Sequence, residues 1–307
     1  MSHEIIFHHY PTSPFSEKIR LIFGIKRLSW RSVEIPNMLP KPDLVPLTGG
    51  YRKTPVMQIG ADIYCDTQLI ARELERRFPS PSIVPHGKGL PYGLGFWADR
   101  LFFMPTVGII FGEIGDSVPE AFKKDRAAMS GNTFSTETMK AAAPFVRDQF
   151  RAHLSFIAEQ LEDGRKNLQG SEPTLADVHA MMNLWFLKGA LPQVAKSLLE
   201  EFPKVEAWYG RLRAIGHGTV TTMESKDALQ IAKIAAPEAQ TAADPHDPNG
   251  RKPGDTVTVS ADDYGRDPVR GEIVFSNAHE IAIRRFDEAI GEVVVHFPRA
   301  GFNVASA

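Results

Sequence analysis

Over residues 3–85 the apolar positions switch between the spacing of a strand and that of a helix. This pattern predicts strands at residues 5–7, 30–35, 54–59 and 63–65. It predicts helices over residues 14–27 and from 66–67 to about 78. The order βαβ and then ββα predicts an α/β unit whose first two strands run parallel, because a helix connects them.

A linker rich in proline and glycine follows over residues 79–89, and from there the long apolar patterns are helical as far as about residue 236. A break at residues 170–173 precedes Thr174 and Asp177, which are spaced as in a capping box. The residues that follow are apolar too densely for a surface helix. We therefore expect this helix to be central and buried.

A second linker covers residues 237–255, and after Gly254 the pattern has period two. It predicts four short strands, at residues 256–259, 271–275, 280–285 and 292–296. Short strands over about fifty residues suggest a small all-β, barrel-like domain. The predicted domains are therefore an α/β domain over 1–85, an all-helical domain over 86–238 and a β domain over 245–307.

Composition narrows the class of protein. The 307 residues are 43% hydrophobic and 23% charged, with a net charge of −2, which is ordinary for a soluble globular chain. The balance of charge gives no broad attraction to nucleic acid or to a membrane surface. Cys65 is the one cysteine, so no intrachain disulfide forms, which suits a reducing compartment. The histidines lack metal-ligand spacing, and we expect a cytoplasmic protein without metal, nucleic acid or membrane.

The segment between the first strand and the first helix has the residues of an anion site. Ser13 fits the N-cap of the helix, and Pro14 fits its first turn. Free backbone N–H groups and the helix dipole favour negative charge there. A hydroxyl at this point can donate a hydrogen bond to a bound thiolate and help keep it ionised. A plain helix cap accounts for the same two residues.

Three motifs taken in order resemble the glutathione S-transferase family. They are Ser13-Pro14-Phe15-Ser16, Thr54-Pro55-Val56 and Asp66-Thr67. The resemblance covers residues 3–80, and Thr174-Leu175-Ala176-Asp177 resembles the buried capping box of the family's helical domain. It implies a thioredoxin-like α/β domain followed by an all-α domain. Residues 245–305 lie outside the usual family pattern.

The resemblance implies a role for the hydroxyl groups near the first helix. Ser13 matches the serine that hydrogen-bonds the glutathione sulfur in serine-type members. Tyr10 is the alternative, because tyrosine-type members place a tyrosine near the end of the first strand. Ser16 is a third choice. A serine cannot form a mixed disulfide, so we favour attack by a bound thiolate over thiol–disulfide exchange.

The other motifs imply contacts with the glutathione peptide. Thr54 matches the residue that pairs with the cysteinyl backbone, and Pro55 matches the family's cis-proline. Asp66 and Thr67 match the pair that holds the γ-glutamyl group at a helix N-terminus. Lys53, and after it Lys41, are the cations expected to reach the glycyl carboxylate. Taken singly, these residues are also compatible with caps, a strand-entry proline and solvated lysines.

The function implied is that of a cytoplasmic, homodimeric glutathione transferase of the detoxification type, with glutathione as substrate. It would activate the thiol for attack on a small apolar electrophile. The expected pocket for this co-substrate contains Tyr10, Phe96, Arg100 and Phe103, although core packing also explains these aromatic side chains. The alternatives are a non-catalytic binding or regulatory protein that uses the β domain for interaction, and a glutathione-dependent isomerase or lyase.

Overall fold

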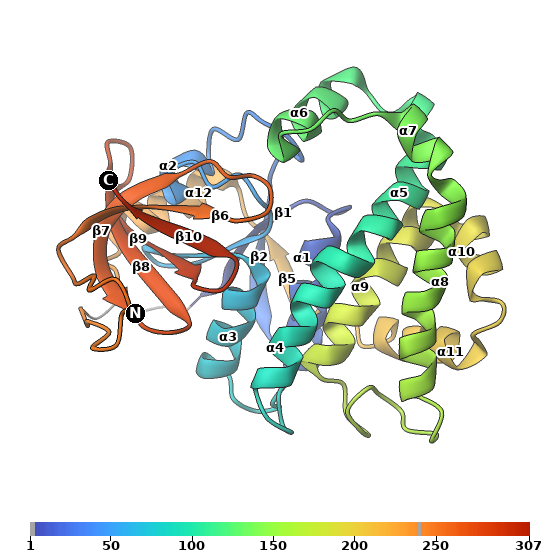
Figure 1. Ribbon diagram of the computed structural model, residues 1–307. Coiled ribbons are helices and arrows are strands. Elements are labelled where there is room, and N and C mark those ends of the chain that lie inside the picture. Colours follow the sequence, from blue (N-terminus) through green and yellow to red (C-terminus); the bar gives the residue numbers. More distant parts are fainter. Residues whose placement is uncertain (1–3, 239–240) are drawn as a thin grey trace.

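The computed structural model describes residues 4–238 and 241–307, and one ten-stranded sheet runs through its α/β and β parts (Figure 1). The strands occur in the spatial order β10-β6-β7-β8-β9-β4-β3-β1-β2-β5. Their bounds are β1 Ile6–His9, β2 Ser29–Glu34, β3 Val56–Ile59, β4 Asp62–Cys65, β5 Thr219–Thr222, β6 Thr256–Ala261, β7 Val269–Ser276, β8 Glu280–Asp287, β9 Gly291–Pro298 and β10 Phe302–Ser306.

The helices that accompany the sheet, in chain order, are α1 Pro14–Ile25, α2 Val45–Thr48, α3 Thr67–Arg77, α4 Gly89–Phe96, α5 Phe103–Ile114, α6 Glu120–Ser130, α7 Thr136–Ala141, α8 Ala143–Gln160, α9 Leu175–Ala190, α10 Pro192–Leu199, α11 Pro203–Arg213 and α12 Ser225–Ile234. A π-helical segment, η1 (Trp97–Phe102), joins α4 to α5, and a 3₁₀ turn, η2 (Gly115–Ser117), ends α5. In Figure 1 the C-terminal strands β6–β10 occupy the left-hand part of the molecule, and most of the helices α4–α11 occupy the right-hand part.

The thioredoxin-like part follows the sequence prediction. β1 and β2 are parallel across α1, and β3 and β4 form the expected antiparallel hairpin. Ser13 caps α1, because its side-chain oxygen accepts a hydrogen bond from the backbone N–H of Ser16 at 3.1 Å. The sequence prediction missed β5, which pairs in parallel with β2 from within the stretch expected to be helical.

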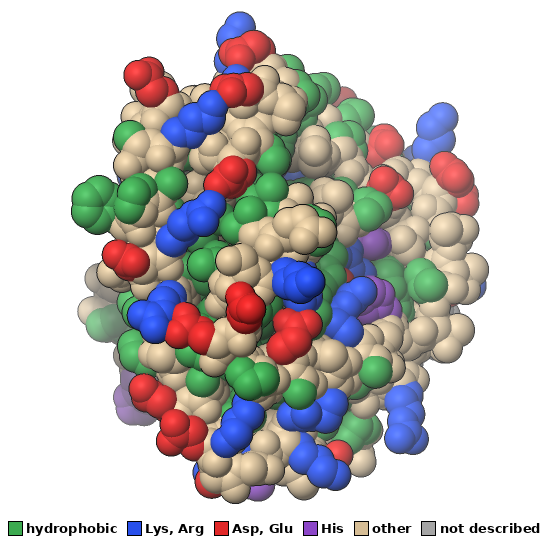
Figure 2. Space-filling model, turned by 90° about the vertical axis from the view of Figure 1, so that its right-hand side faces the viewer, with side chains coloured by type: hydrophobic (Ala, Val, Ile, Leu, Met, Phe, Trp, Pro, Cys, Tyr) green, Lys and Arg blue, Asp and Glu red, His purple; other side chains and the backbone are tan. Residues whose placement is uncertain are grey.

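The helical part is organised around α9. Thr174 and Asp177 form the predicted capping box, and the Asp177 carboxylate also accepts a hydrogen bond from Trp208 Nε1 at 2.8 Å. By length and composition alone, the continuous helix Gly89–Ser117 is apolar enough to cross a membrane. In this structure it packs against α8 and α9, with Phe102 and Ile109 in the core. Figure 2 shows acidic and basic side chains interspersed with hydrophobic patches on this side of the molecule.

The C-terminal strands extend the thioredoxin-like sheet. β9 pairs in parallel with β4, and the described sheet is open, with β10 at one end and β5 at the other. One apolar cluster joins Ile6 and Val33 on the outer face of the thioredoxin strands to Ile283 and Val295 in the added strands. The predicted fold class is confirmed, but the added strands do not close into a separate barrel, and β10 was not predicted. The division by residue range stays a prediction.

A buried histidine, His296, stabilises the junction between β4 and the C-terminal strands. His296 on β9 lies 2.9 Å from Asp62 on β4 and 2.6 Å from Glu280 on β8, and its ring stacks on Tyr64. Burial alone would lower the pKa of His296. The hydrogen bonds and charges of the two carboxylates outweigh burial and raise this pKa to about 9. His296 is therefore a cation between two acids.

We expect the free energy of unfolding to depend on the charge of His296. Its pKa is raised from 6.5 to about 9 in the folded state, so its stabilisation is complete below pH 6.5 and is lost as the pH rises through about 9. A pKa shift of this size corresponds to a contribution of about 3 kcal/mol to the free energy of unfolding. Denaturant unfolding at pH 6, 7.5 and 9 measures it. His296→Gln should remove most of this decline, and an equally steep decline in the variant would contradict the assignment.

Candidate functional site

The three predicted motifs meet at one end of the thioredoxin-like sheet. The β1–α1 turn carries Tyr10 and Ser13, the peptide bond between Thr54 and Pro55 is cis, and α3 begins at Thr67. Two cavities open on these motifs, one on either side of Thr54. Together they form the candidate site.

The smaller cavity lies at the start of α3. Asp66 is the N-cap of α3, with a φ of 73°, and its carboxylate accepts a hydrogen bond from the backbone N–H of Gln68 at 2.9 Å. A non-glycine residue with positive φ is strained, and such residues concentrate at functional sites. The N-terminal N–H groups of α3 and the carboxylate of Asp66 therefore both face the smaller cavity.

Thr67 is held by a buried ion pair. Lys18 of α1 donates to Thr67 Oγ1 at 3.0 Å and to the Asp99 carboxylate of η1 at 2.7 Å. The Lys18 side chain is 1% exposed, so its charge depends on Asp99 for compensation. This contact ties the thioredoxin-like part to the helical part directly beneath the start of α3.

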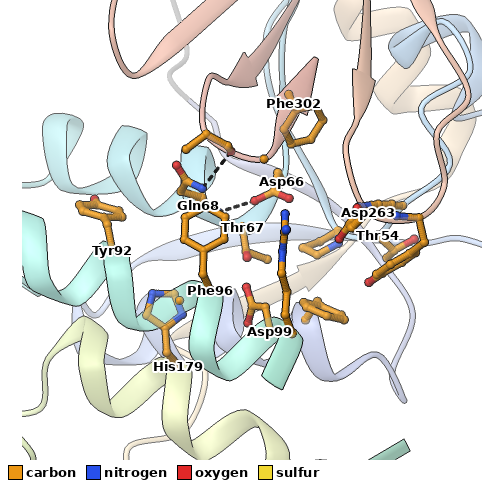
Figure 3. Close-up of a pocket in the computed structure, with 18 of the residues that line it drawn as sticks. Thr54, Asp66, Thr67, Gln68, Tyr92, Phe96, Asp99, His179, Asp263 and Phe302 are labelled. Atoms are coloured by element: carbon orange, nitrogen blue, oxygen red, sulfur yellow. Dashed lines mark hydrogen bonds and ion pairs between the residues drawn. The ribbon is translucent and has the colours of Figure 1, made fainter. Parts of the chain in front are cut away.

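The volume of the smaller cavity is about 60 Å³. Figure 3 shows Asp66, Thr67 and Gln68 in the upper part of the view and Asp99 and His179 in the lower part, with the ring of Phe96 reaching up toward Gln68. Its walls combine the motif residues with residues of α4, η1, α9 and the C-terminal strands, namely Phe15, Tyr51, Lys53, Thr54, Pro55, Asp66, Thr67, Gln68, Tyr92, Gly95, Phe96, Asp99, Arg100, His179, Asp263, Tyr264, Ala300, Gly301 and Phe302.

The C-terminal region covers this end of the site. The loop between β6 and β7 brings Asp263 into an ion pair with Lys53, whose ammonium also lies 4.2 Å from the centre of the Tyr264 ring. In the same loop, Asp262 pairs with Arg100 at 2.5 Å. Lys53, the cation expected to bind a ligand carboxylate, is therefore already engaged by a carboxylate of the chain itself.

The larger cavity has a volume of about 430 Å³ and lies between the thioredoxin-like part and α5–α7. Most of its lining is apolar, in particular Pro14, Phe15, Met38, Leu39, Phe103, Met104, Val107, Phe111, Phe122, Met129, Phe134, Met139 and Phe186. A largely apolar pocket with a few polar groups at one end is typical of a small-molecule site.

Tyr10 stands at the polar end of the larger cavity. Burial raises the pKa of its phenol, although the positive charge of Arg126 and the nearby Ser13 hydroxyl act in the opposite direction. The phenol therefore stays protonated at neutral pH and is able to donate a hydrogen bond. Ser13 is fully buried and lines neither cavity.

Positive charge exceeds negative charge at this polar end. Lys41, Arg52 and Arg126 line it together with a single acid, Asp125, which pairs with both arginines. Lys41 donates to two neutral oxygens, the carbonyl of Arg52 at 3.0 Å and Thr54 Oγ1 at 2.9 Å. Burial and the neighbouring Arg126 lower the pKa of Lys41 to about 8. This end of the cavity is suited to an anion.

The predicted pocket residues divide between the two cavities. Tyr10 and Phe103 line the larger cavity, whereas Phe96 and Arg100 line the smaller one beside Thr67. Of the predicted glutathione contacts, Pro55, Asp66 and Thr67 line the smaller cavity only. The two cavities share four residues, Phe15, Lys53, Thr54 and Tyr264. A ligand that spans both must therefore pass between these four residues, Thr54 among them.

Several residues of the site were not predicted from the sequence. Lys18, Asp99 and His179 looked like ordinary positions of amphipathic helices, while Asp263 and Tyr264 belong to a loop outside the family pattern. The one available signal was the charge of Lys18 on the apolar face of the first helix. Within the described ranges, no group of three or more His, Cys, Asp or Glu side chains is arranged to hold a metal ion.

Family models identify two parts of the chain. The glutathione S-transferase N-terminal domain matches residues 7–82, and a domain of unknown function matches residues 115–219. The fold, the cis-proline and the start of α3 agree with the first of these matches. They define a protein of the glutathione S-transferase class.

The relatives extend this assignment to the whole chain. A GST-like protein from Pseudomonas syringae is 40% identical, its crystal structure has a TM-score of 0.83, and the match covers 100% of both chains. The chain therefore belongs to the family of GST-like proteins, the C-terminal strands included.

Two further relatives are more distant. FtsZ-localized protein A of Caulobacter vibrioides is 23% identical over 222 residues, which cover 70% of this chain and 89% of that protein. A glutathione S-transferase from Rhodospirillum rubrum F11 is 21% identical with a TM-score of 0.51, and the match covers 68% of this chain and 88% of that one. At these identities the two solved structures, including that of the Caulobacter protein, show the shared fold alone.

We expect Cys65 to be unreactive in the folded protein. Its side chain is fully buried at the end of β4, and burial together with the adjacent Asp66 carboxylate holds the pKa of its thiol well above the usual value. An aromatic disulfide reagent should therefore detect no thiol in the native protein and one per chain in denaturant. Fast reaction of the native protein would show that this strand opens and that thiol chemistry at Cys65 must be considered.

Proposed function

We propose that this protein is a glutathione transferase that binds glutathione across Thr54 and presents its thiolate to an apolar electrophile in the larger cavity. The observation that carries the proposal is the position of Thr54, the residue before cis-Pro55, on the boundary between a polar cavity at the start of α3 and a 430 Å³ apolar cavity. A glutathione molecule combines a polar peptide with a reactive sulfur, so it needs both environments.

The contacts that we propose for the glutathione peptide follow from the charges of the residues that line the two cavities. The γ-glutamyl group would lie against Asp66 and Thr67, where an acid and a helix N-terminus are suited to its ammonium and its carboxylate. The cysteinyl backbone would pair with Thr54. For the glycyl carboxylate, Lys41 pairs with no acid among the described residues, whereas Lys53 is available only after Asp263 releases it.

For the sulfur we propose Tyr10 as the hydroxyl that faces the thiolate. Tyr10 lines the larger cavity, where the charge of Arg126 and the Ser13 hydroxyl both favour the ionised form of its phenol. Ser13 would then act on the sulfur through Tyr10, because its own oxygen already accepts a hydrogen bond from Ser16 and is closed off from both cavities. A lowering of the thiol pKa from about 8.5 by two units needs about 2.7 kcal/mol, which a charge-assisted hydrogen bond and a helix N-terminus together supply.

A second candidate is a glutathione-transferase-like binding protein without turnover. A cavity of about 60 Å³ and a paired Lys53 favour it, since the smaller cavity has to widen before it admits a tripeptide. The resemblance to FtsZ-localized protein A allows a role in protein association for this chain. Leu90 and Leu101 are exposed on the helix Gly89–Ser117, and these apolar side chains support the expected homodimer.

The absorbance of bound glutathione thiolate as a function of pH tests the proposal. In the wild type the thiol pKa should lie well below about 8.5. Tyr10→Phe should raise it by about one unit, and Ser13→Ala by less. Binding with an unshifted thiol pKa would favour the second candidate. A larger effect of Ser13→Ala than of Tyr10→Phe would return the direct role to Ser13.

Release of Lys53 should strengthen glutathione binding. Asp263→Asn keeps the shape of the side chain but removes the carboxylate that neutralises Lys53, which frees this cation for the ligand. Isothermal titration should show an affinity about fivefold higher than in the wild type, equivalent to about 1 kcal/mol. Glu288→Gln, an exposed change of the same charge in the β8–β9 turn, is the control and should have no effect. Weaker binding in Asp263→Asn would mean that Asp263 itself contacts the ligand.

A further inference from the structure

His179 is a buried polar side chain that the fold leaves without a partner. It lies in the middle of α9, is 2% exposed, and neither ring nitrogen has a hydrogen-bond partner in the part of the chain that the structure describes. Buried polar groups are nearly always hydrogen-bonded, and an exception calls for an explanation. The ring of His179 lines the smaller cavity, opposite the start of α3 (Figure 3).

The position of the ring depends on Gly95 of α4. A Cβ atom at residue 95 would lie 3.1 Å from Cε1 and 3.2 Å from Nε2 of His179, closer than most side chains tolerate. A glycine at this point lets the imidazole lie flush against α4 and reach the cavity. Two elements from different parts of the helical region thus combine to place an unsatisfied imidazole on the wall of the cavity.

The imidazole has both kinds of hydrogen-bonding capacity. Burial, reinforced by the nearby ammonium of Lys18, holds the pKa of His179 well below its usual value, so the ring is neutral. A neutral imidazole has one N–H donor and one nitrogen acceptor. It can therefore satisfy a carboxylate or an ammonium without adding a charge to the cavity.

We propose that His179 recognises the amino-acid head, the α-ammonium and α-carboxylate, of a γ-glutamyl ligand in the smaller cavity. This inference rests on the proposed glutathione function and extends it to a residue of the helical part. The cavity, of about 60 Å³, is far smaller than the neighbouring cavity of about 430 Å³, which suits one small polar group better than a whole tripeptide. The head group enters where Asp66, the N-terminus of α3 and His179 converge.

The other charges of the cavity favour this arrangement. Asp99 is compensated by Lys18, Asp263 by Lys53, and Arg100 by Asp262. Asp66 has no basic partner among the ion pairs of the described residues, so it is the acid left for the ligand ammonium. The ligand carboxylate then faces the N–H groups of α3 on one side and the imidazole on the other.

The proposal is tested by measuring the affinities of the wild type and of variants for two ligands, glutathione and cysteinylglycine. Cysteinylglycine lacks the γ-glutamyl residue that His179 is proposed to recognise. His179→Leu should weaken glutathione binding about tenfold and leave cysteinylglycine binding within about twofold. His179→Gln, which keeps a donor and an acceptor, should recover most of the loss. His153→Leu, a histidine of α8 that lines neither cavity, is the matched control and should change neither affinity.

The possible outcomes separate the inference from the function on which it rests. The role of His179 would be overturned if His179→Leu weakened the binding of both ligands equally. It would also be overturned if the variant bound both ligands as tightly as the wild type, which would mean that the cavity holds only water. Absence of glutathione binding in the wild type would overturn the proposed function as well. A measurement on the wild type keeps the test valid if a variant fails to fold: glutathione should shift the ring-nitrogen resonances of His179, and cysteinylglycine should not.

Discussion

The pairing of β9 with β4 is the contact on which the candidate site depends most. It places the C-terminal strands beside the thioredoxin-like hairpin, and the buried cation of His296 between Asp62 and Glu280 secures the register. Because β6 and β7 are held in the same sheet, the loop between them reaches across to Lys53. The chemistry near Thr54 is therefore set by strands that the thioredoxin-like fold does not itself require.

The polar groups around the site are arranged as pairs that cross between parts of the fold. Lys18 of the thioredoxin-like part meets Asp99 of the helical part, and Lys53 meets Asp263 of the C-terminal region. Such pairs offset the cost of burying a charge, and they also compete with any ligand for the same groups. Within the described part of the chain, Lys41 and Asp66 have no partner of opposite charge and His179 has no hydrogen-bond partner, so these groups remain for a ligand.

Local patterns in the sequence predicted the local parts of the fold. The cap at Ser13, the capping box of Thr174 and Asp177, and the cis-proline depend on neighbouring residues or on a family motif, and all three are present. The fold class was recognised for the same reason. Strand β5 was missed because four exposed residues have no apolar alternation, and their strand exists through pairing with β2.

The site was harder to predict than the fold, because its contacts join residues that are far apart in the chain. Lys53 and Asp263 are separated by 210 positions, and nothing near either residue indicates the other. The expected pocket placed Phe96 and Arg100 with Phe103, but the π-helical turn of η1 directs the first two toward α3 and the third toward the larger cavity. Periodicity alone does not reveal such a change of direction.

The shared sheet also has a consequence for the order in which the protein is made. Until the ribosome has passed β9 (Gly291–Pro298), strand β4 has no partner on its outer side, and the apolar face around Ile6, Val33 and Val56 lacks the part of its cover that the C-terminal strands supply. An unpaired strand beside an uncovered apolar face is a template for association with other chains. A nascent chain of this protein therefore exposes a surface prone to association until β9, which begins at Gly291, has been synthesised and has paired with β4.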